Sequence, residues 1–256
     1  MARYKEYGYD IQDGKAIIPE WETEIKDLAF KGYEELTSVE FPLWIKKIGT
    51  EAFCDCENLT DITLPKWVEE IGKRALSDCK NLRSINFPRW VKKIDKGAFS
   101  GCSGLTSISI PPSVTEIEEG VFSGCSSLTS ISIPPSVTEI GEWAFNDCSS
   151  LTRISIPESV TEIGSSTFSG CSSLTSITVS KDNKVYDSRE DCNAIIHTES
   201  NTLIRGCENT VIPPLVTEIG EYAFSDCKNL TSIAIPESVT KIGENAFKGC
   251  SSLTNL

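Results

Sequence analysis

Cysteine is the residue type in this chain whose number and spacing most invite a chemical interpretation, because thiolates bind metal ions and thiol pairs form disulfides. The 256 residues include eleven cysteines but a single histidine, His197. Eight of the cysteines share a spacing of 23 residues, namely Cys56, Cys79, Cys102, Cys125, Cys148 and Cys171, and then Cys227 and Cys250. This spacing lacks the paired C-x-x-C knuckles of a zinc site. We therefore predict no metal and interpret the spaced cysteines as a column of small buried side chains.

Three cysteines fall outside this spacing. Cys54 is expected to be an exposed neighbour of Cys56. Cys192 and Cys207 lie where the spacing is interrupted, and they are the two that could pair in an oxidising compartment. Side chains that point in parallel along a column are badly placed for bridging, so the column itself is expected to stay reduced.

The residues needed for enzymatic chemistry do not assemble into a motif. The sequence holds no G-x-S-x-G, no phosphate-cradling glycine loop and no H-E-x-x-H. Its many carboxylates recur at repeating positions, which is typical of solvated surface columns. We therefore predict a non-enzymatic protein without a cofactor.

The charge of the chain is acidic and unevenly distributed. The formal net charge is -13, and residues 105–256 carry most of it. An acidic body without basic clusters argues against nucleic acid or anionic lipid as a partner, because phosphates require lysine or arginine. No run approaches the roughly 18 apolar residues of a membrane span, and the N-terminus lacks the order of a secretory signal. The protein is therefore either cytoplasmic or separated from its leader.

The elements that position these residues are short and repeat every 23 residues. Three successive segments, which start at Leu105, Leu128 and Leu151, read LTSISIPPSVTEIEEGVFSGCSS, LTSISIPPSVTEIGEWAFNDCSS and LTRISIPESVTEIGSSTFSGCSS. The I-x-I alternation predicts a short strand that proline ends, since proline cannot donate to a ladder. V-x-x-I-G predicts a second extended segment, and A-F-x-x-C a helical or 3-10 turn. No unit can bury its apolar residues alone, so each is predicted to be one coil of a stacked solenoid.

The pattern L-x-x-I-x-I-P-x-x-V-x-x-I-G-x-x-A-F-x-x-C resembles the BspA-like leucine-rich repeat family over residues 13–256. The resemblance implies a right-handed leucine-rich-repeat solenoid of mostly short β-strands with short helical or 3-10 turns. We predict an N-terminal cap at 1–12, regular repeats at 13–173 with a degenerate first unit, an irregular 33-residue repeat with a hairpin at 174–206, and regular repeats at 207–256. The final SSLTNL carries no polar cap, so this end is expected to offer a surface for self-association.

Charged pairs precede the I-G step and alternate in sign along three successive coils. They are Lys46-Lys47, Glu69-Glu70 and Lys92-Lys93. Opposite charges on neighbouring strands attract by roughly a few tenths of a kcal/mol per pair. We expect these pairs to help set the register between coils.

Tryptophans supply the candidate binding residues. Trp21, Trp44, Trp67 and Trp90 are spaced by 23 residues, at the position that serine holds in later coils. Because serine suffices there, the site is not expected to lie deep in the core. The rings could stack on each other along a coil edge, or they could form a platform for sugar rings or an apolar partner. On the outward strand face, which is mostly serine and threonine, Arg83 and Arg153 are further candidate contacts.

The resemblance implies a cell-surface or secreted module that binds proteins, including host extracellular-matrix proteins, through the solenoid surface. Two alternatives stay open at this point. One is a carbohydrate-binding surface centred on the tryptophan column. The other is an intracellular protein-interaction scaffold, which reduced cysteines would permit.

Overall fold

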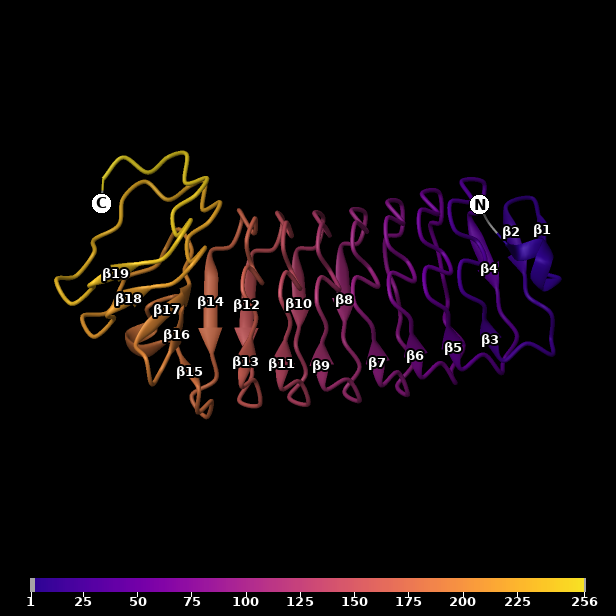
Figure 1. Ribbon diagram of the computed structural model, residues 1–256, viewed down its shortest axis with the longest axis horizontal. Helices are drawn as coiled ribbons and strands as arrows, with labels where there is room; N and C mark the ends of the chain where they lie inside the picture. The colour runs from indigo at the N-terminus through magenta and orange to yellow at the C-terminus, as the bar shows by residue number, and fades with distance from the viewer. Residues whose placement is uncertain (1–2, 256) are drawn as a thin grey trace.

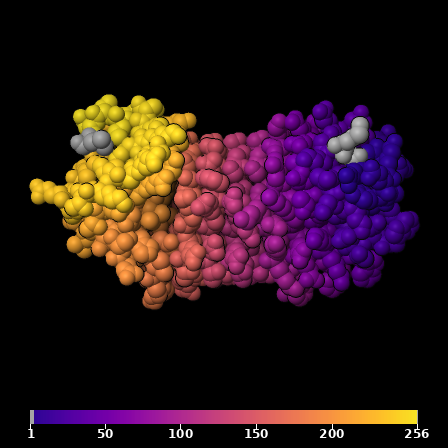
Figure 2. Space-filling view, in the orientation of Figure 1, coloured from indigo at the N-terminus to yellow at the C-terminus, as the bar shows by residue number. Residues whose placement is uncertain are grey.

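The computed structural model describes residues 3–255, which wind into a β-solenoid of about ten coils (Figure 1). The first two residues of the predicted cap and Leu256 lie outside the described residues. The coils stack side by side along the long axis, and the space-filling view shows one elongated body (Figure 2). The predicted leucine-rich-repeat solenoid is therefore confirmed.

Two rows of short parallel strands run along the regular coils. One row follows the I-x-I segments and contains β4 (Ser38–Glu40), β8 (Ser107–Ser109), β10 (Ser130–Ser132), β12 (Arg153–Ile156) and β14 (Ser176–Val179). The other follows the x-I-G steps and contains β3 (Glu24–Ile25), β5 (Lys47–Ile48), β6 (Glu70–Ile71), β7 (Lys93–Ile94), β9 (Glu116–Ile117), β11 (Glu139–Ile140) and β13 (Glu162–Ile163). Partners in both rows are 23 residues apart, as in the pair Ile131 and Ile108. The repeat length therefore equals one turn of the solenoid.

The N-terminal end is closed by a short helical turn and a hairpin. The 3-10 helix η1 covers Tyr4–Tyr7, and β1 (Asp10–Gln12) pairs antiparallel with β2 (Lys15–Ile17). Strand β2 then pairs parallel with β4 of the next coil. The ring of Tyr9 lies stacked on Phe30 at 5.7 Å, so aromatic side chains cover the first coil.

The core consists of columns of identical side chains that run through the stack. Phenylalanines of successive coils lie parallel, for example Phe122 and Phe145 with ring centroids 5.6 Å apart. Such offset stacking adds to the burial of apolar area that each ring brings. Leucine, isoleucine and valine fill the neighbouring columns.

The A-F-x-x-C segments are turns rather than helical segments, which differs from the predicted helical or 3-10 turn. Two residues with left-handed backbone limit each turn: in the second regular coil these are Glu51, at φ 52°, and Asp55, at φ 60°. A right-handed helix cannot continue through such a residue. The chain therefore bends twice around the phenylalanine and enters the next coil.

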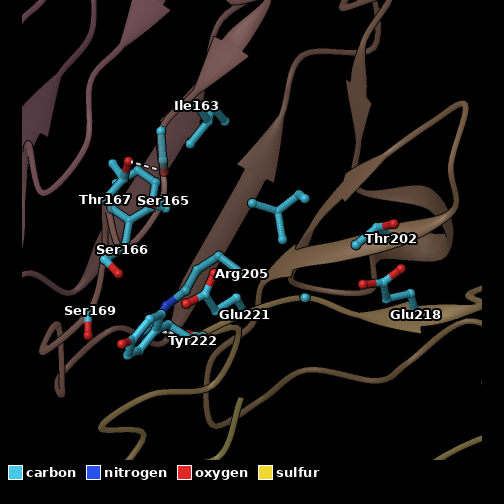
Figure 3. A pocket seen from close by; sticks show the side chains of 14 residues that line it. Ile163, Ser165, Ser166, Thr167, Ser169, Thr202, Arg205, Glu218, Glu221 and Tyr222 are labelled. Atoms are coloured by element: carbon cyan, nitrogen blue, oxygen red, sulfur yellow. Dashed lines mark hydrogen bonds between the residues drawn. The ribbon is translucent and has the colours of Figure 1, made fainter. Parts of the chain in front are cut away.

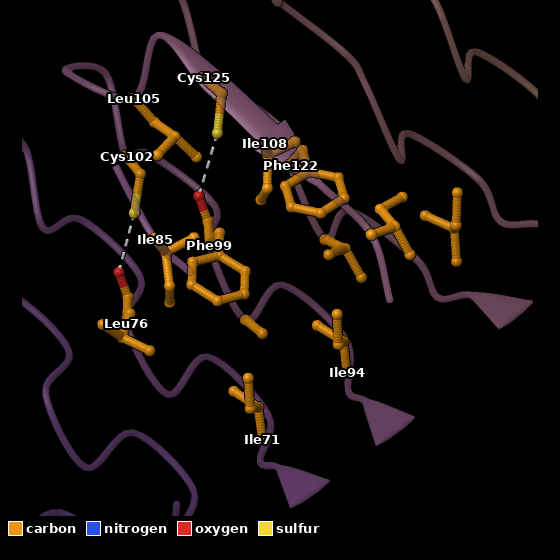
Figure 4. Close-up of a cluster of buried hydrophobic side chains, with 14 of the residues drawn as sticks. Ile71, Leu76, Ile85, Ile94, Phe99, Cys102, Leu105, Ile108, Phe122 and Cys125 are labelled. Carbon is orange, nitrogen blue, oxygen red and sulfur yellow. Dashed lines mark hydrogen bonds between the residues drawn. The ribbon is translucent and has the colours of Figure 1, made fainter. Parts of the chain in front are cut away.

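The spaced cysteines form a buried column in which each thiol bonds the coil before it. Cys102 Sγ donates to Leu76 O at 3.1 Å, and Cys125 Sγ donates to Phe99 O at 3.3 Å (Figure 4). Burial raises the pKa of the Cys102 thiol to about 12, since a thiolate would place a charge in the core. The column is thus both a packing element and a ladder of inter-coil S–H bonds.

The expectation for Cys54 is wrong, because its side chain is buried rather than exposed. Neighbouring turns close over this position, and the equivalent Ser77 one coil further on is also fully buried. Cys192 and Cys207 are free and buried, and Cys207 Sγ donates to Asn193 O at 3.6 Å.

The alternating charges before the I-G steps form ion pairs between coils, as predicted. Lys92 Nζ lies 2.8 Å from Glu69 Oε2, and Lys47 Nζ lies 3.5 Å from Glu70 Oε2. These side chains are about half exposed, so each pair contributes at most about 1 kcal/mol. We expect these pairs mainly to favour the register in which equivalent positions of neighbouring coils lie side by side.

The irregular repeat replaces one regular turn with extra strands. It contains β15 (Tyr186–Asp187), the 3-10 helix η2 (Arg189–Asp191), β16 (Ile195–His197) and β17 (Thr202–Arg205), followed by β18 (Glu218–Ile219) and β19 (Lys241–Ile242) of the last coils. Strands β16 and β17 are antiparallel, while β17, β18 and β19 are parallel. Beyond this repeat the last coils change direction (Figure 1), and the apolar core divides into two clusters.

Candidate functional site

The tryptophan row consists of Trp21, Trp44, Trp67 and Trp90 and lies in the turn that follows the strand proline. In the coil of Trp67 this turn closes when Val68 N–H donates to Pro65 O at 3.1 Å. The four side chains are 38% to 78% exposed, and Leu43, next to Trp44, is 64% exposed. Four large aromatic residues and a leucine thus face solvent along the first coils.

The rings of this row do not stack on each other. Among residues 3–255 no tryptophan ring is paired with another aromatic ring. Two of the rings instead lie beneath the cationic side chain of the preceding residue. Lys66 Nζ lies 4.9 Å from the centroid of the Trp67 ring, and Arg89 Cζ lies 5.1 Å from the centroid of the Trp90 ring. Cation–π contacts at exposed sites contribute about 0.5–1 kcal/mol. The stacking interpretation is therefore wrong, because the rings point outward at the edge of each coil.

Serine at the equivalent position of later coils makes a hydrogen bond to the preceding coil that tryptophan does not make. Ser136 Oγ donates to Val114 O of the preceding coil at 2.7 Å, and Ser159 Oγ donates to Val137 O at 2.6 Å. Ser238 makes the same bond to Val216 O at 2.8 Å. An indole cannot reach back in this way. The first coils therefore carry exposed tryptophans in place of an inter-coil hydrogen bond.

Replacing Trp67 by serine is expected to lower the free energy of unfolding by no more than about 2 kcal/mol, because a new bond to Ile45 O offsets part of the lost cation–π contact and buried ring area. Urea denaturation of the purified variant measures this. The reverse change, Ser136→Trp, removes a hydrogen bond and is expected to destabilise by roughly 1 kcal/mol. A loss above about 3 kcal/mol in Trp67→Ser, the size expected for a buried aromatic, would show that the ring is a core residue after all.

Arg83 and Arg153 are exposed but do not join the tryptophan row. Arg83 O accepts the N–H of Thr106 at 3.2 Å, and Arg153 begins β12, where it pairs with Ser130 and Ser176. The two arginines are separated by three coils, which corresponds to about 15 Å along the stack. The fold therefore gives no single site that contains all six candidate residues.

A pocket at the irregular repeat was not foreseen from the sequence. It has a volume of about 290 Å³ and lies between the turn of residues 164–169 and that of residues 220–222, which come together because the irregular repeat lacks its own A-F-x-x-C turn (Figure 3). The same gap brings Ser169 Oγ within 2.9 Å of Ser225 Oγ, although 56 residues separate them. The missing motif is the signal from which this hollow could have been inferred.

Arg205 fills the deep part of this gap and is only 3% exposed. Its Nη1 donates to Tyr222 O at 3.2 Å and to Ser225 O at 3.0 Å, while Nε has no partner within the described structure. In a regular coil the equivalent carbonyl, that of Ser77, accepts a backbone N–H from Asp55 at 2.8 Å. The guanidinium therefore supplies the donor that the missing turn would have supplied.

No group of three or more histidine, cysteine or acidic side chains in residues 3–255 is arranged to hold a metal ion. No helix in the same range has the length and apolarity to cross a membrane.

A solenoid of 23-residue coils with columns of leucine, isoleucine and phenylalanine defines a leucine-rich-repeat protein. The chain belongs to the family described as the BspA type leucine rich repeat region, whose model matches residues 23–148, 92–200 and 196–256. No curated protein matches the chain.

Solved structures of bacterial proteins share this fold. A leucine-rich cell surface protein from Faecalibacterium prausnitzii is 32% identical, with a TM-score of 0.82 over 96% of this chain and 73% of that one. A leucine-rich repeat protein from Bacteroides ovatus is 27% identical, with a TM-score of 0.54 over 94% and 77%. The pneumococcal vaccine antigen PcpA, at 19% identity and a TM-score of 0.70 over 96% and 67%, shows the fold alone.

Proposed function

We propose that the chain is a non-enzymatic protein-binding module of the bacterial cell surface and that the tryptophan row is its main contact. The observation that carries this proposal is the exposure of four tryptophans at a position where serine makes an inter-coil hydrogen bond in later coils. A side chain that the fold does not require, and that replaces a hydrogen bond, is best explained by a partner that covers it.

The chemistry of the row suits an apolar protein surface with acidic groups around it. Tryptophan and arginine are the residues that most often dominate the energy of protein interfaces. Lys66 and Arg89 flank the rings and could pair with carboxylates of the partner, while Leu43 extends the apolar area. Residues 1–104 are also the less acidic part of the chain, so an acidic partner is repelled least there.

The surface location rests on family membership and on the description of the F. prausnitzii relative as a cell surface protein. We extend the proposal to adhesion, in which the row would bind matrix proteins of a host. A leader and an anchor in the full gene would accord with this location, and an intracellular scaffold would have neither.

Binding to a panel of purified matrix proteins, namely fibronectin, fibrinogen, laminin and collagen, tests the proposal by surface plasmon resonance. The double variant Trp44→Ser/Trp67→Ser is expected to weaken any interaction by about 1,000-fold, because each hot-spot residue contributes roughly 2 kcal/mol. Leu215→Ser is the matched control, since Leu215 occupies the same turn position in a C-terminal coil and is also exposed.

Unchanged binding by the double variant would remove the tryptophan row from the proposal. A glycan array probed with the same proteins addresses the carbohydrate alternative. Binding to neutral glycans that the double variant loses would replace the protein partner by a sugar.

A further inference from the structure

A second exposed tryptophan, Trp143, lies at a different corner of the coils, in the G-x-x-A-F turn. Its position has a left-handed backbone in every regular coil, with φ between 51° and 62°, and is occupied by Leu28, Glu51, Arg74, Gly97, Gly120, Trp143, Ser166, Tyr222 and Asn245. Most of these residues have side chains, so the fold tolerates one there. The two coils that come before the coil of Trp143 nevertheless have glycine at this position, namely Gly97 and Gly120.

The two glycines leave a notch in this row of side chains. Gly97 and Gly120 lie on its floor with Ser100 and Ser123, and Trp143 and Arg74 lie at its two ends. The notch has a volume of about 440 Å³, within the roughly 300–1,000 Å³ of small-molecule sites. A Cβ at Gly120 would meet nothing closer than Ser123 Cβ at 4.0 Å, so packing does not require glycine at this place.

The Trp143 ring has no structural partner. It is 46% exposed, and within residues 3–255 it pairs with no aromatic ring and no cation. A bulky side chain at positive φ costs free energy that glycine or asparagine would not. Trp143 is thus a half-exposed, strained tryptophan at one end of a notch, at a position where the neighbouring coils have glycine or serine.

The rim of the notch is positively charged in an otherwise acidic protein. Lys73, Arg74 and Lys96 line it against the single carboxylate of Glu119. Lys96 is paired with Glu119 at 3.1 Å and Arg74 with Asp78 at 3.7 Å. Lys73 takes part in none of the ion pairs of the described residues, so its ammonium is free for a ligand.

We propose that this notch binds a short stretch of an acidic glycan chain, in which one saccharide unit packs on Trp143 and a neighbouring unit carries a carboxylate, such as a uronic acid. The C–H face of a sugar ring packs on an indole, which explains the free Trp143 face. The hydroxyls of the chain fit the serine floor, and the acid group of the neighbouring unit pairs with Lys73 and Arg74 at the other end of the notch. The notch combines an indole face at one end with cations at the other. An acidic sugar would contact both, whereas a simple anion would contact only the cations.

Isothermal titration with a tetrasaccharide of alternating glucuronic acid and N-acetylglucosamine tests the proposal. The wild-type protein is expected to bind, and Trp143→Ser, which installs the residue of the next coil, is expected to weaken binding about tenfold or more. Gly120→Tyr is expected to block the notch with Trp143 still present, because Tyr222 already occupies the equivalent position elsewhere. Lys73→Ser is expected to weaken binding of this acidic ligand about tenfold.

The repeat provides the controls. Tyr222→Ser changes the same turn position three repeats further along the chain, counting the irregular repeat, and is expected to leave binding unchanged. The melting temperature of Trp143→Ser is expected to be no lower than that of the wild type, which separates a binding role from a structural one.

Three results would overturn the proposal: no binding of the acidic tetrasaccharide, equal binding of the tetrasaccharide of N-acetylglucosamine alone, or unchanged binding by Trp143→Ser. Tighter binding of a poly-glutamate peptide would assign the notch to acidic proteins instead. The site is separate from the tryptophan row, so failure here leaves the proposed protein-binding function standing.

Discussion

Raising the pH from 8 to 10 is expected to unfold the protein. Burial raises the pKa of the Cys56 and Cys171 thiols to about 12 and that of Cys192 to about 11, and it raises the pKa of Cys125 and Cys148 well above the usual value. An unfolded cysteine ionises near pH 8.5. Above that pH the unfolded chain releases protons that the folded chain retains, so the free energy of unfolding falls as the pH rises.

The expected size of this effect is large because the thiols act together. Each buried thiol contributes a loss of about 2 kcal/mol at pH 10, from 1.36 kcal/mol per pH unit above the unfolded pKa. Burial raises the pKa of nine thiols, all but those of Cys207 and Cys250, to about 11 or further. Their summed loss, about 18 kcal/mol, exceeds the roughly 5–15 kcal/mol stability of a typical domain. The midpoint of unfolding is therefore expected at about pH 9 to 10.

Circular dichroism during an alkaline titration measures this transition, and urea denaturation between pH 7.5 and 9 measures its slope. Replacing Cys102, Cys125 and Cys148 by alanine is expected to reduce that slope by about 1.5 kcal/mol per pH unit over this range, since three fewer thiols ionise on unfolding and each unfolded thiol is only partly ionised below pH 9. A melting temperature that does not change between pH 8 and 10 would contradict the assignment of the column as buried neutral thiols.

Replacing Arg205 by alanine is expected to destabilise the protein by about 3–5 kcal/mol and to separate the unfolding of the last coils from that of the others. The change leaves the carbonyl oxygens of Tyr222 and Ser225 without this donor, and it opens a hollow between the two apolar clusters. In a solenoid each coil is stabilised by its neighbours, so a weakened junction divides the cooperative unit.

Differential scanning calorimetry distinguishes this result from a simple loss of stability. The variant is expected to show two transitions where the wild type shows one. Arg205→Met restores volume but no donor, so an intermediate loss of roughly 2 kcal/mol is expected. Arg83→Ala removes an exposed arginine and is the matched control, with a change within about 0.5 kcal/mol. A single transition in Arg205→Ala would show that the junction is held without its guanidinium.

Much of the fold could be predicted from the sequence because the repeat is regular. Spacing alone places Ile108 beside Ile131 and Lys92 beside Glu69, since residues 23 apart become neighbours once coils stack. The 23-residue spacing likewise predicted a buried column for Cys102 and Cys125. The candidate surface was predicted only in part: the tryptophan row is exposed, as serine at the same position suggested, but its rings do not stack.

The sequence by itself determined which residues are repeated, and the tertiary structure decided how their side chains point and what lies between them. Side-chain direction at a coil corner depends on the turn geometry, so only the tertiary structure showed that the Trp67 ring does not stack on its neighbours and that Cys54 is buried. Gly97, Gly120 and Trp143 form a notch only because stacking brings three successive coils together. Arg205 reaches the carbonyl of Ser225 only because an absent turn leaves that oxygen uncovered. A periodic sequence predicts the contacts between equivalent positions of successive coils. The contacts of residues that depart from the repeat depend on which side chains the neighbouring coils place beside them.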